Sequence, residues 1–149
     1  MTMLTGESTA EIDAGVERCW AVLQDVARWP RWQQGLESVE VVETDAEGRV
    51  LVCDTVSDAR VKKVACRVGL SYDAPYRVSF TRVESEDVDA MDGSWELEEL
   101  AGDRTRATFR LALDAGPVNF MARALERALR PLVVGRRAQE LAAEVTALD

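Results

Sequence analysis

The sequence contains no histidine among its 149 residues, so the side chain that most often acts as a general base or metal ligand is absent. Arg67 and Arg82 could bind and polarise a substrate oxygen if they faced a cavity, because a guanidinium stabilises developing negative charge. Tyr72 and Tyr76 flank an expected hairpin turn and could transfer protons only if that turn bordered the cavity. The catalytic residues are therefore undetermined, with Arg67 and Arg82 as the candidates.

The cysteines give no sign of a metal site or a nucleophile. Cys19, Cys53 and Cys66 lie among apolar residues and form no C-x-x-C motif. Their odd number and apolar surroundings indicate reduced, buried thiols, as in a cytoplasmic protein, and buried thiols are usually unreactive. We expect no metal and no cofactor.

Charge and hydropathy restrict the partners. Acidic residues outnumber basic ones 27 to 18, for a net charge of -9, which opposes binding to a nucleic acid. No apolar stretch approaches the ~20 residues that span a bilayer, and residues 1–13 lack the features of a secretory signal. These patterns predict a cytoplasmic location without integral membrane association. The arginines near the C-terminus are expected on the solvent face of a helix: Arg123, Arg127, Arg130, Arg136 and Arg137.

The N-terminal region predicts one strand and two short helices. Residues 7–12 have the pattern of a strand, and Asp13 is placed to cap a helix over residues 14–26. A helical turn over residues 28–34 carries Trp29-Pro30-Arg31-Trp32 and ends at Gly35.

Six strands are expected next, at residues 36–44, 49–57, 61–72, 76–85, 95–100 and 104–114, separated by turn signals. With its turn centred on Gly102, the last hairpin pairs Trp95 with Phe109 and Glu98 with Arg106. One face is then apolar and the other carries complementary charges, which favours this register.

The middle hairpin predicts a similar division between an apolar and a solvated face. Centred on Ala74, it pairs Leu70 with Val78 and Val68 with Phe80.

The same register decides which arginine faces inward. It places Arg82 on the apolar face beside Cys66, whereas Arg67 lies on the solvated face opposite Thr81. In the hairpin of residues 36–57, Asp54 falls opposite Val39, on the side that carries Val41 and Val52, so it is either a polar inward group or a solvated aspartate at the strand end.

A long helix over residues 117–147 is expected to cover the apolar face of the sheet. Met121, Leu125 and Leu129 contribute to its apolar stripe, and Pro131 is expected to kink it.

The order of these elements resembles the START-like (SRPBCC, helix-grip) superfamily, and within it the polyketide cyclase/dehydrase and coenzyme-Q-binding branch. The resemblance covers residues 7–147 and rests on the segments Ile12-Asp13-Ala14, Trp29-Pro30, Asp73-Ala74-Pro75 and Gly93-Ser94-Trp95-Glu96-Leu97. It implies an α+β helix-grip fold in a single domain over residues 1–149. In that fold a curved antiparallel sheet of about seven strands wraps around a long C-terminal helix, with two short helices after the first strand.

The resemblance also implies a cavity between the sheet and the final helix. The residues expected to bind a ligand there, each of which could instead serve core packing, are Trp29, Trp32, Val52, Cys66, Val68, Phe80, Trp95, Phe109, Met121, Leu125 and Leu129. Cyclases of this superfamily carry a pocket arginine at the position similar to Arg67, but Leu36 stands where they have a tyrosine.

Three functions follow from these patterns. The first is binding, transport or sequestration of a small hydrophobic molecule such as a lipid, quinone or polyketide, by a monomer or homodimer. The second is a polyketide cyclase or dehydratase. The third is a protein-interaction module similar to the ribosome-association relatives.

Overall fold

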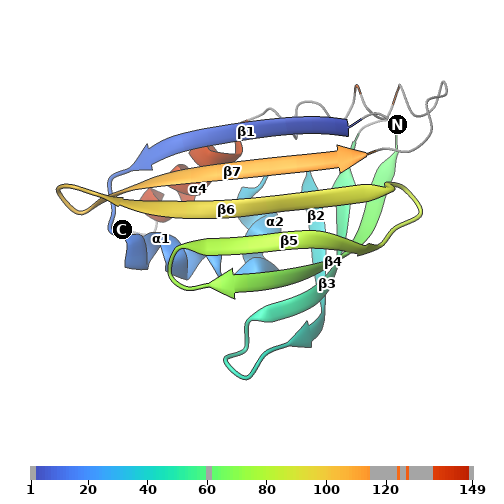
Figure 1. Cartoon of the computed structure of the whole chain (residues 1–149), viewed down its shortest axis with the longest axis horizontal. Helices are drawn as coiled ribbons and strands as arrows, with labels where there is room; N and C mark the ends of the chain where they lie inside the picture. The colour runs from blue at the N-terminus through green and yellow to red at the C-terminus, as the bar shows by residue number, and fades with distance from the viewer. Residues whose placement is uncertain (1–2, 60–61, 115–123, 125–126, 128–135, 148–149) are drawn as a thin grey trace.

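The fold is α+β, with an antiparallel seven-stranded sheet that curves around a layer of helices (Figure 1). A computed structural model describes residues 3–59, 62–114, 124, 127 and 136–147. The strands lie in the order β1-β7-β6-β5-β4-β3-β2. Their bounds are β1 Met3–Ile12, β2 Leu36–Thr44, β3 Val50–Asp58, β4 Lys63–Asp73, β5 Arg77–Glu84, β6 Ala90–Leu100 and β7 Arg104–Asp114.

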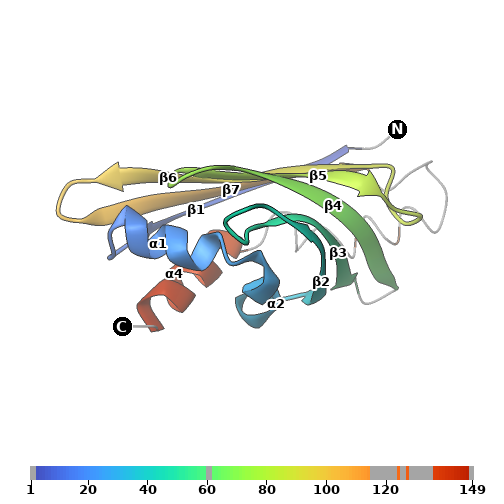
Figure 2. The same cartoon turned by 90° about the horizontal axis from the view of Figure 1, so that it is seen from below.

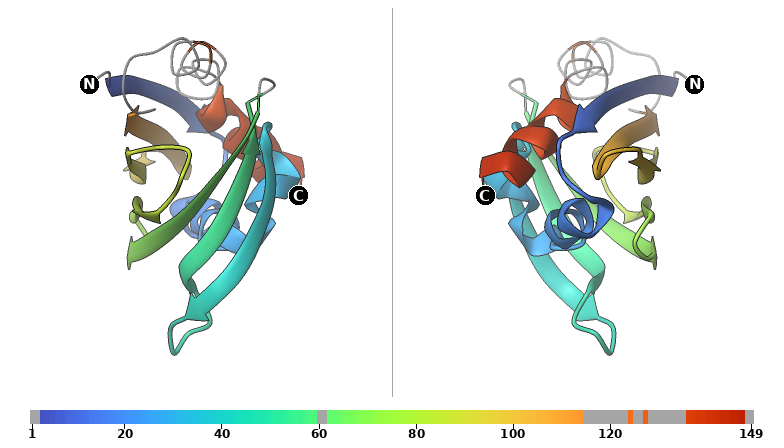
Figure 3. Two further views of the ribbon diagram at one scale, coloured as in Figure 1. Left: turned by 90° about the vertical axis from the view of Figure 1, so that its right-hand side faces the viewer. Right: turned by 90° about the vertical axis from the view of Figure 1, so that its left-hand side faces the viewer.

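The described helices occupy the concave side of the sheet (Figure 2). They are α1 (Val16–Leu23), the 3₁₀ turn η1 (Val26–Arg28), α2 (Trp29–Trp32) and α4 (Arg137–Ala147). Helix α4 packs against β1 and α1, and the β2–β3 hairpin curls around the helices from the other side (Figure 3). This arrangement confirms the predicted helix-grip architecture.

Helix α1 shows why the sequence forms this layer. Its buried residues Val16, Cys19, Trp20 and Leu23 recur at three- and four-residue steps, so they share the face that meets the sheet. The predicted cap is wrong. Gly15, and not Asp13, occupies the N-cap, no side chain caps the helix, and the helix covers residues 16–23 of the expected 14–26.

The register of the last hairpin is as predicted. Trp95 pairs with Phe109 and Glu98 with Arg106. Trp95 is fully buried and Phe109 is 4% exposed, so the apolar side of the sheet faces the helices.

The register predicted for the middle hairpin is wrong by two residues. Leu70 pairs with Phe80 and Val68 with Arg82, whereas the expected partners were Val78 and Phe80. A shift of two residues preserves the alternation of a strand, so the apolar face was assigned correctly although the partners were not.

The C-terminal helix is described from Arg137 to Ala147, where Leu141 and Val145 are buried as expected. The expectations for Met121, Leu125, Leu129 and Pro131 fall outside the residues that the structure describes.

Candidate ligand-binding cavity

A cavity of ≈ 110 Å³ lies between the concave face of the sheet and the helices. Most of its described lining is apolar: Val26, Trp29, Leu36, Cys53, Val64, Val68, Leu70, Phe80, Val88, Met91, Phe109, Leu111 and Leu113. Four polar residues complete this wall: Gln33, Thr55, Ser57 and Arg137. Such a composition suits a small apolar molecule that carries few polar groups.

Three aromatic rings form one side of the cavity. Phe80 stacks on Phe109 with ring centroids 6.2 Å apart, and Trp29 meets Phe80 edge-on at 6.0 Å. The indole N–H of Trp29 donates to the carbonyl of Leu23 at 2.9 Å, which fixes the ring at the end of α1. The turn formed by η1 and α2 therefore holds an aromatic wall in one orientation.

Trp32 and Trp95 lie behind this wall and not on the lining. Their rings are 5.7 Å apart, Trp32 also meets Trp29 edge-on at 6.5 Å, and Trp95 lies 4.9 Å from Phe109. The indole nitrogens of Trp32 and Trp95 are buried without a hydrogen-bond partner. Both residues therefore support the cavity wall from the core.

One end of the cavity is polar because three chain segments meet there. Gln33 follows α2, Ser57 lies near the end of β3, and Arg137 begins the described part of α4. The guanidinium of Arg137 donates through Nη1 to the carbonyl of Gln34 at 2.9 Å. The backbone N–H of Asp58 donates to the carbonyl of Gly35 at 2.8 Å.

Arg137 is a buried cation held by one carboxylate. Its Nη1 donates to Oε1 of Glu140 at 2.8 Å, and Oε2 of the same carboxylate accepts the backbone N–H of Gln34 at 2.9 Å. Burial lowers the pKa of Arg137, whereas the charge of Glu140 opposes that shift. The Nε atom of Arg137 has no hydrogen-bond partner, and the same holds for Nε2 of Gln33.

The start of α4 is fixed against β1. The backbone N–H of Ala138 donates to Oγ of Ser8 at 2.8 Å, and the side-chain amide of Gln139 donates to the carbonyl of Thr9 at 3.1 Å. These bonds determine where Arg137 meets the cavity. They also explain why Ser8 is buried on a strand of otherwise apolar inward residues.

Neither candidate catalytic arginine lines the described cavity. Arg67 lies on the outer face of the sheet, where it binds Asp54 through two hydrogen bonds of 2.8 and 3.0 Å. The predicted pairing of Arg67 with Thr81 is wrong. A bulge between Arg67 and Val68 places Glu84 opposite Arg67.

Arg82 lies on the concave face, as predicted from alternation. Its guanidinium is occupied by the β5–β6 loop, where it donates to the carbonyls of Ser85 and Val88 at 2.9 and 2.8 Å. Both contacts are structural, because they close a loop at the rim of the sheet.

Two predictions for β3 are wrong, namely that Val52 faces the cavity and that Asp54 pairs with Val39. Val52 pairs with Gly69 on the outer face, and Cys53 lines the cavity in its place. Asp54 lies opposite Glu40, not Val39. Bulges in β2 shift the pairing and explain this error.

Cys66, on β4, was also expected to line the cavity. It is buried on the inner face but is not part of the described lining.

Two buried thiols and one tyrosine on the strands near the cavity have raised pKa values. Burial raises the pKa of the thiols of Cys53 and Cys66 to about 11. Burial also raises the pKa of Tyr72, whose hydroxyl donates to the carbonyl of Val50 at 2.6 Å. These groups are therefore unsuited to proton transfer near neutral pH.

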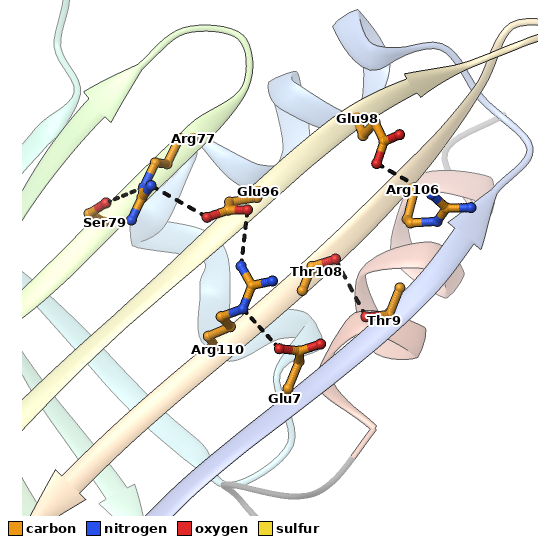
Figure 4. A network of polar contacts seen from close by, with 9 residues as sticks. All are labelled: Glu7, Thr9, Arg77, Ser79, Glu96, Glu98, Arg106, Thr108 and Arg110. Carbon is orange, nitrogen blue, oxygen red and sulfur yellow. Dashed lines mark hydrogen bonds and ion pairs between the residues drawn. The ribbon is translucent and has the colours of Figure 1, made fainter.

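The outer face of the sheet carries a charged network (Figure 4). Arg110 bridges Glu7 at 2.9 Å and Glu96 at 3.0 Å, and Arg77 contacts Glu96 at 3.4 Å. An open depression of ≈ 860 Å³ overlies part of this network. It is larger than the inner cavity, and its lining mixes apolar residues such as Leu70 and Leu111 with the ion-paired Glu7 and Arg110.

Within the described residues, no group of three or more histidine, cysteine or acidic side chains could hold a metal ion. No helix in the same part of the chain is long and apolar enough to cross a membrane.

Sequence reasoning identified four of the lining residues, namely Trp29, Val68, Phe80 and Phe109. It missed Gln33, and it wrongly assigned Arg137 to a solvated helix face, although this residue is only 9% exposed. A signal was available, because Arg137 precedes the buried Leu141 by four residues and therefore shares its helix face.

The chain is similar to a known protein family and to several solved structures. The profile of the family described as "Polyketide cyclase / dehydrase and lipid transport" matches residues 3–145. A search of curated protein sequences found no match.

Solved structures share the fold at low sequence identity. A START superfamily protein from Mycobacterium smegmatis is 16% identical, with a TM-score of 0.76 and coverage of 99% of each chain. The Zhui aromatase/cyclase from a Streptomyces species is 18% identical, with a TM-score of 0.81 and coverage of 97% of this chain and 94% of that one. A protein from Thermus thermophilus is 20% identical, with a TM-score of 0.75 and coverage of 98% of this chain and 99% of that one.

Proposed function

Because the chain belongs to the polyketide cyclase / dehydrase and lipid transport family, we propose that it binds a small hydrophobic molecule in the cavity between the sheet and the helices. The observation that carries this proposal is the apolar lining of the ≈ 110 Å³ cavity, with its aromatic side of Trp29, Phe80 and Phe109. Burying the apolar surface of a ligand there contributes about 25 cal/mol per Å².

The size of the cavity limits the ligand. Pockets for drug-sized molecules usually enclose roughly 300–1,000 Å³, well above the ≈ 110 Å³ here. A ligand is therefore small, or it displaces side chains of the wall. Met91 is suited to such a displacement because its unbranched side chain has several rotatable bonds and is only partly buried.

The side chains that line the described cavity are better suited to ligand binding than to catalysis. A cyclase would need both a polarising group and a proton-transferring group on the cavity wall. Arg137 could polarise a substrate oxygen, but the described lining contains no acidic residue, lysine or tyrosine that could transfer a proton. Arg67 and Arg82 are engaged elsewhere, and burial keeps the thiol of Cys53 neutral. We propose carriage or sequestration of the ligand as the function, and we do not propose the cyclase alternative.

The interaction-module alternative has less support from the described surface. The large hydrophobic side chains exposed there are Val41, Val42, Tyr76 and Val83. Single exposed apolar residues of this kind are ordinary features of a protein surface.

A pair of matched substitutions tests the site. Val68→Phe places a ring in the cavity, whereas Val83→Phe makes the same change at a valine that is 52% exposed on the outer face. We expect the first variant to lose binding of ethylbenzene, measured by isothermal titration calorimetry, and the second to retain the wild-type affinity. Thermal unfolding of both variants verifies that each is folded. Equal affinity in the two variants would place the ligand outside the cavity.

A further inference from the structure

Two hydrogen-bond donors at the polar end of the cavity lack partners. These are Nε2 of Gln33 and Nε of Arg137, on side chains of residues that are 5% and 9% exposed. Both residues line the cavity, although each of the two nitrogen atoms exposes less than 1 Å², so a ligand reaches them only after a small movement of these side chains. A buried donor without a partner is rare in native proteins, because it has lost its hydrogen bonds to water and gained none in return.

The two residues belong to the same end of the cavity. Nη1 of Arg137 reaches the carbonyl of Gln34, the residue next to Gln33. Ser57 also lines the cavity there, since it pairs with Leu36 at the start of β2. Most of the other lining residues are apolar or aromatic. The cavity is therefore amphipathic, with donors gathered at one end.

The charges at this end favour a neutral acceptor over an anion. The positive charge of Arg137 is already matched by Glu140, whose carboxylate lies 2.8 Å from Nη1. A second carboxylate in the cavity would leave a net negative charge in an apolar environment, which is unfavourable. A carbonyl oxygen has two lone pairs, bears no charge and needs no acceptor in return.

We propose that Gln33 and Arg137 recognise a carbonyl oxygen of an otherwise apolar ligand. This inference rests on the proposed binding function and adds the chemical class of the ligand. The ring or chain of the ligand lies against Phe80 and Phe109, and its carbonyl points toward the start of β2 and α4. A ligand without an oxygen acceptor leaves both donors unpaired and binds more weakly.

Three small probes of similar shape test the proposal. Acetophenone carries the carbonyl, ethylbenzene lacks it, and benzoate replaces it with an anion. We expect acetophenone to bind about tenfold more tightly than ethylbenzene, as a hydrogen bond to a previously unpaired buried donor should provide. Benzoate is expected to bind more weakly than acetophenone. Isothermal titration calorimetry gives the three dissociation constants.

The same substitution at neighbouring glutamines supplies a matched control. Gln33→Leu removes a buried donor from the cavity, whereas Gln34→Leu changes an exposed side chain next to it. We expect the preference for acetophenone over ethylbenzene to fall severalfold in Q33L and to remain unchanged in Q34L. Q33L should remain folded, because an apolar side chain of similar size replaces an unsatisfied polar one. In the wild-type protein, acetophenone should also shift the side-chain amide resonances of Gln33.

The outcomes separate this inference from the function on which it rests. If ethylbenzene binds as tightly as acetophenone, the cavity binds hydrophobic molecules but the donors do not select a carbonyl, and the inference is wrong. Tighter binding of benzoate than of acetophenone would overturn it as well. If none of the probes binds, the proposed function and the inference both fall.

Discussion

Gly93 on β6 leaves room for the ring that forms the aromatic side of the cavity. It pairs with Phe80 on β5, and a Cβ atom at this position would lie 2.1 Å from Cζ and 2.5 Å from Cε2 of Phe80. Carbon atoms in contact are normally about 3.5–4.0 Å apart, so Gly93→Ala requires the ring to move by roughly 1.5 Å. Phe109 and Trp29 contact the ring on other sides, and the ring also borders the cavity.

We expect Gly93→Ala to lower the free energy of unfolding by about 1–3 kcal/mol, the usual cost of overpacking. Ligand affinity should fall as well, because the displaced ring occupies part of the cavity. Gly69→Ala is the matched control in the neighbouring strand β4. A Cβ atom there would meet Val83 at 3.4 Å, an ordinary contact, and Gly69 lies on the outer face.

Urea denaturation of a double-mutant cycle measures this effect. The cost of Gly93→Ala should largely disappear in a Phe80→Ala background, because the clash is then absent. Phe80→Ala alone is expected to lower the free energy of unfolding by about 2–3 kcal/mol, because Phe80 is partly buried and its removal enlarges the cavity. Equal stability of G93A and G69A, or an unchanged cost of G93A in the F80A background, would refute the reasoning.

Two further predictions concern buried groups near the helices. Thr105→Val should lower the free energy of unfolding by about 1–2 kcal/mol in urea denaturation, since the fully buried hydroxyl of Thr105 donates to the carbonyl of Ala14 at 2.8 Å. Thr108→Val, at a hydroxyl with only a 3.4 Å contact to Thr9, is the control, and an equal cost in both variants would contradict this prediction. Burial raises the pKa of all three thiols, to about 11 for Cys53 and Cys66, so at pH 8 a thiol reagent should modify none of them in the folded protein and all of them in urea. Rapid modification without denaturant would show that the thiols are accessible.

The order of elements could be predicted from the sequence because each strand alternates and each turn carries a recognisable signal. The β6–β7 hairpin was assigned in register because two independent patterns agree there. Trp95 and Phe109 define one face, and Glu98 and Arg106 define the other. A slip of one residue would have disrupted both patterns.

The β3 strand shows where the same reasoning fails. Leu51, Val52 and Cys53 are all apolar, so alternation alone does not determine which of them faces inward. The bulges in β2 then offset the pairing that would have resolved the choice. Assignment of Val52 in place of Cys53 followed directly from this ambiguity.

The polar end of the cavity could not be predicted because it depends on contacts distant in sequence. Arg137 is buried although arginine usually lies at the surface, and its burial is possible because Gln34 and Glu140 accept its hydrogen bonds. Gln33 is 5% exposed because the end of α2 meets the start of α4 at this point. Only the three-dimensional structure brings these two donors to one cavity.

Contacts between a bound ligand and the inner wall provide the most direct test of the binding cavity. Met91 lines the cavity, so its methyl group reports on the interior. In protein labelled with ¹³C at the methionine methyl groups, the aromatic protons of acetophenone should show intermolecular nuclear Overhauser effects to the Met91 methyl. Effects confined to residues of the outer face, such as Thr81, would contradict a ligand site between the sheet and the helices.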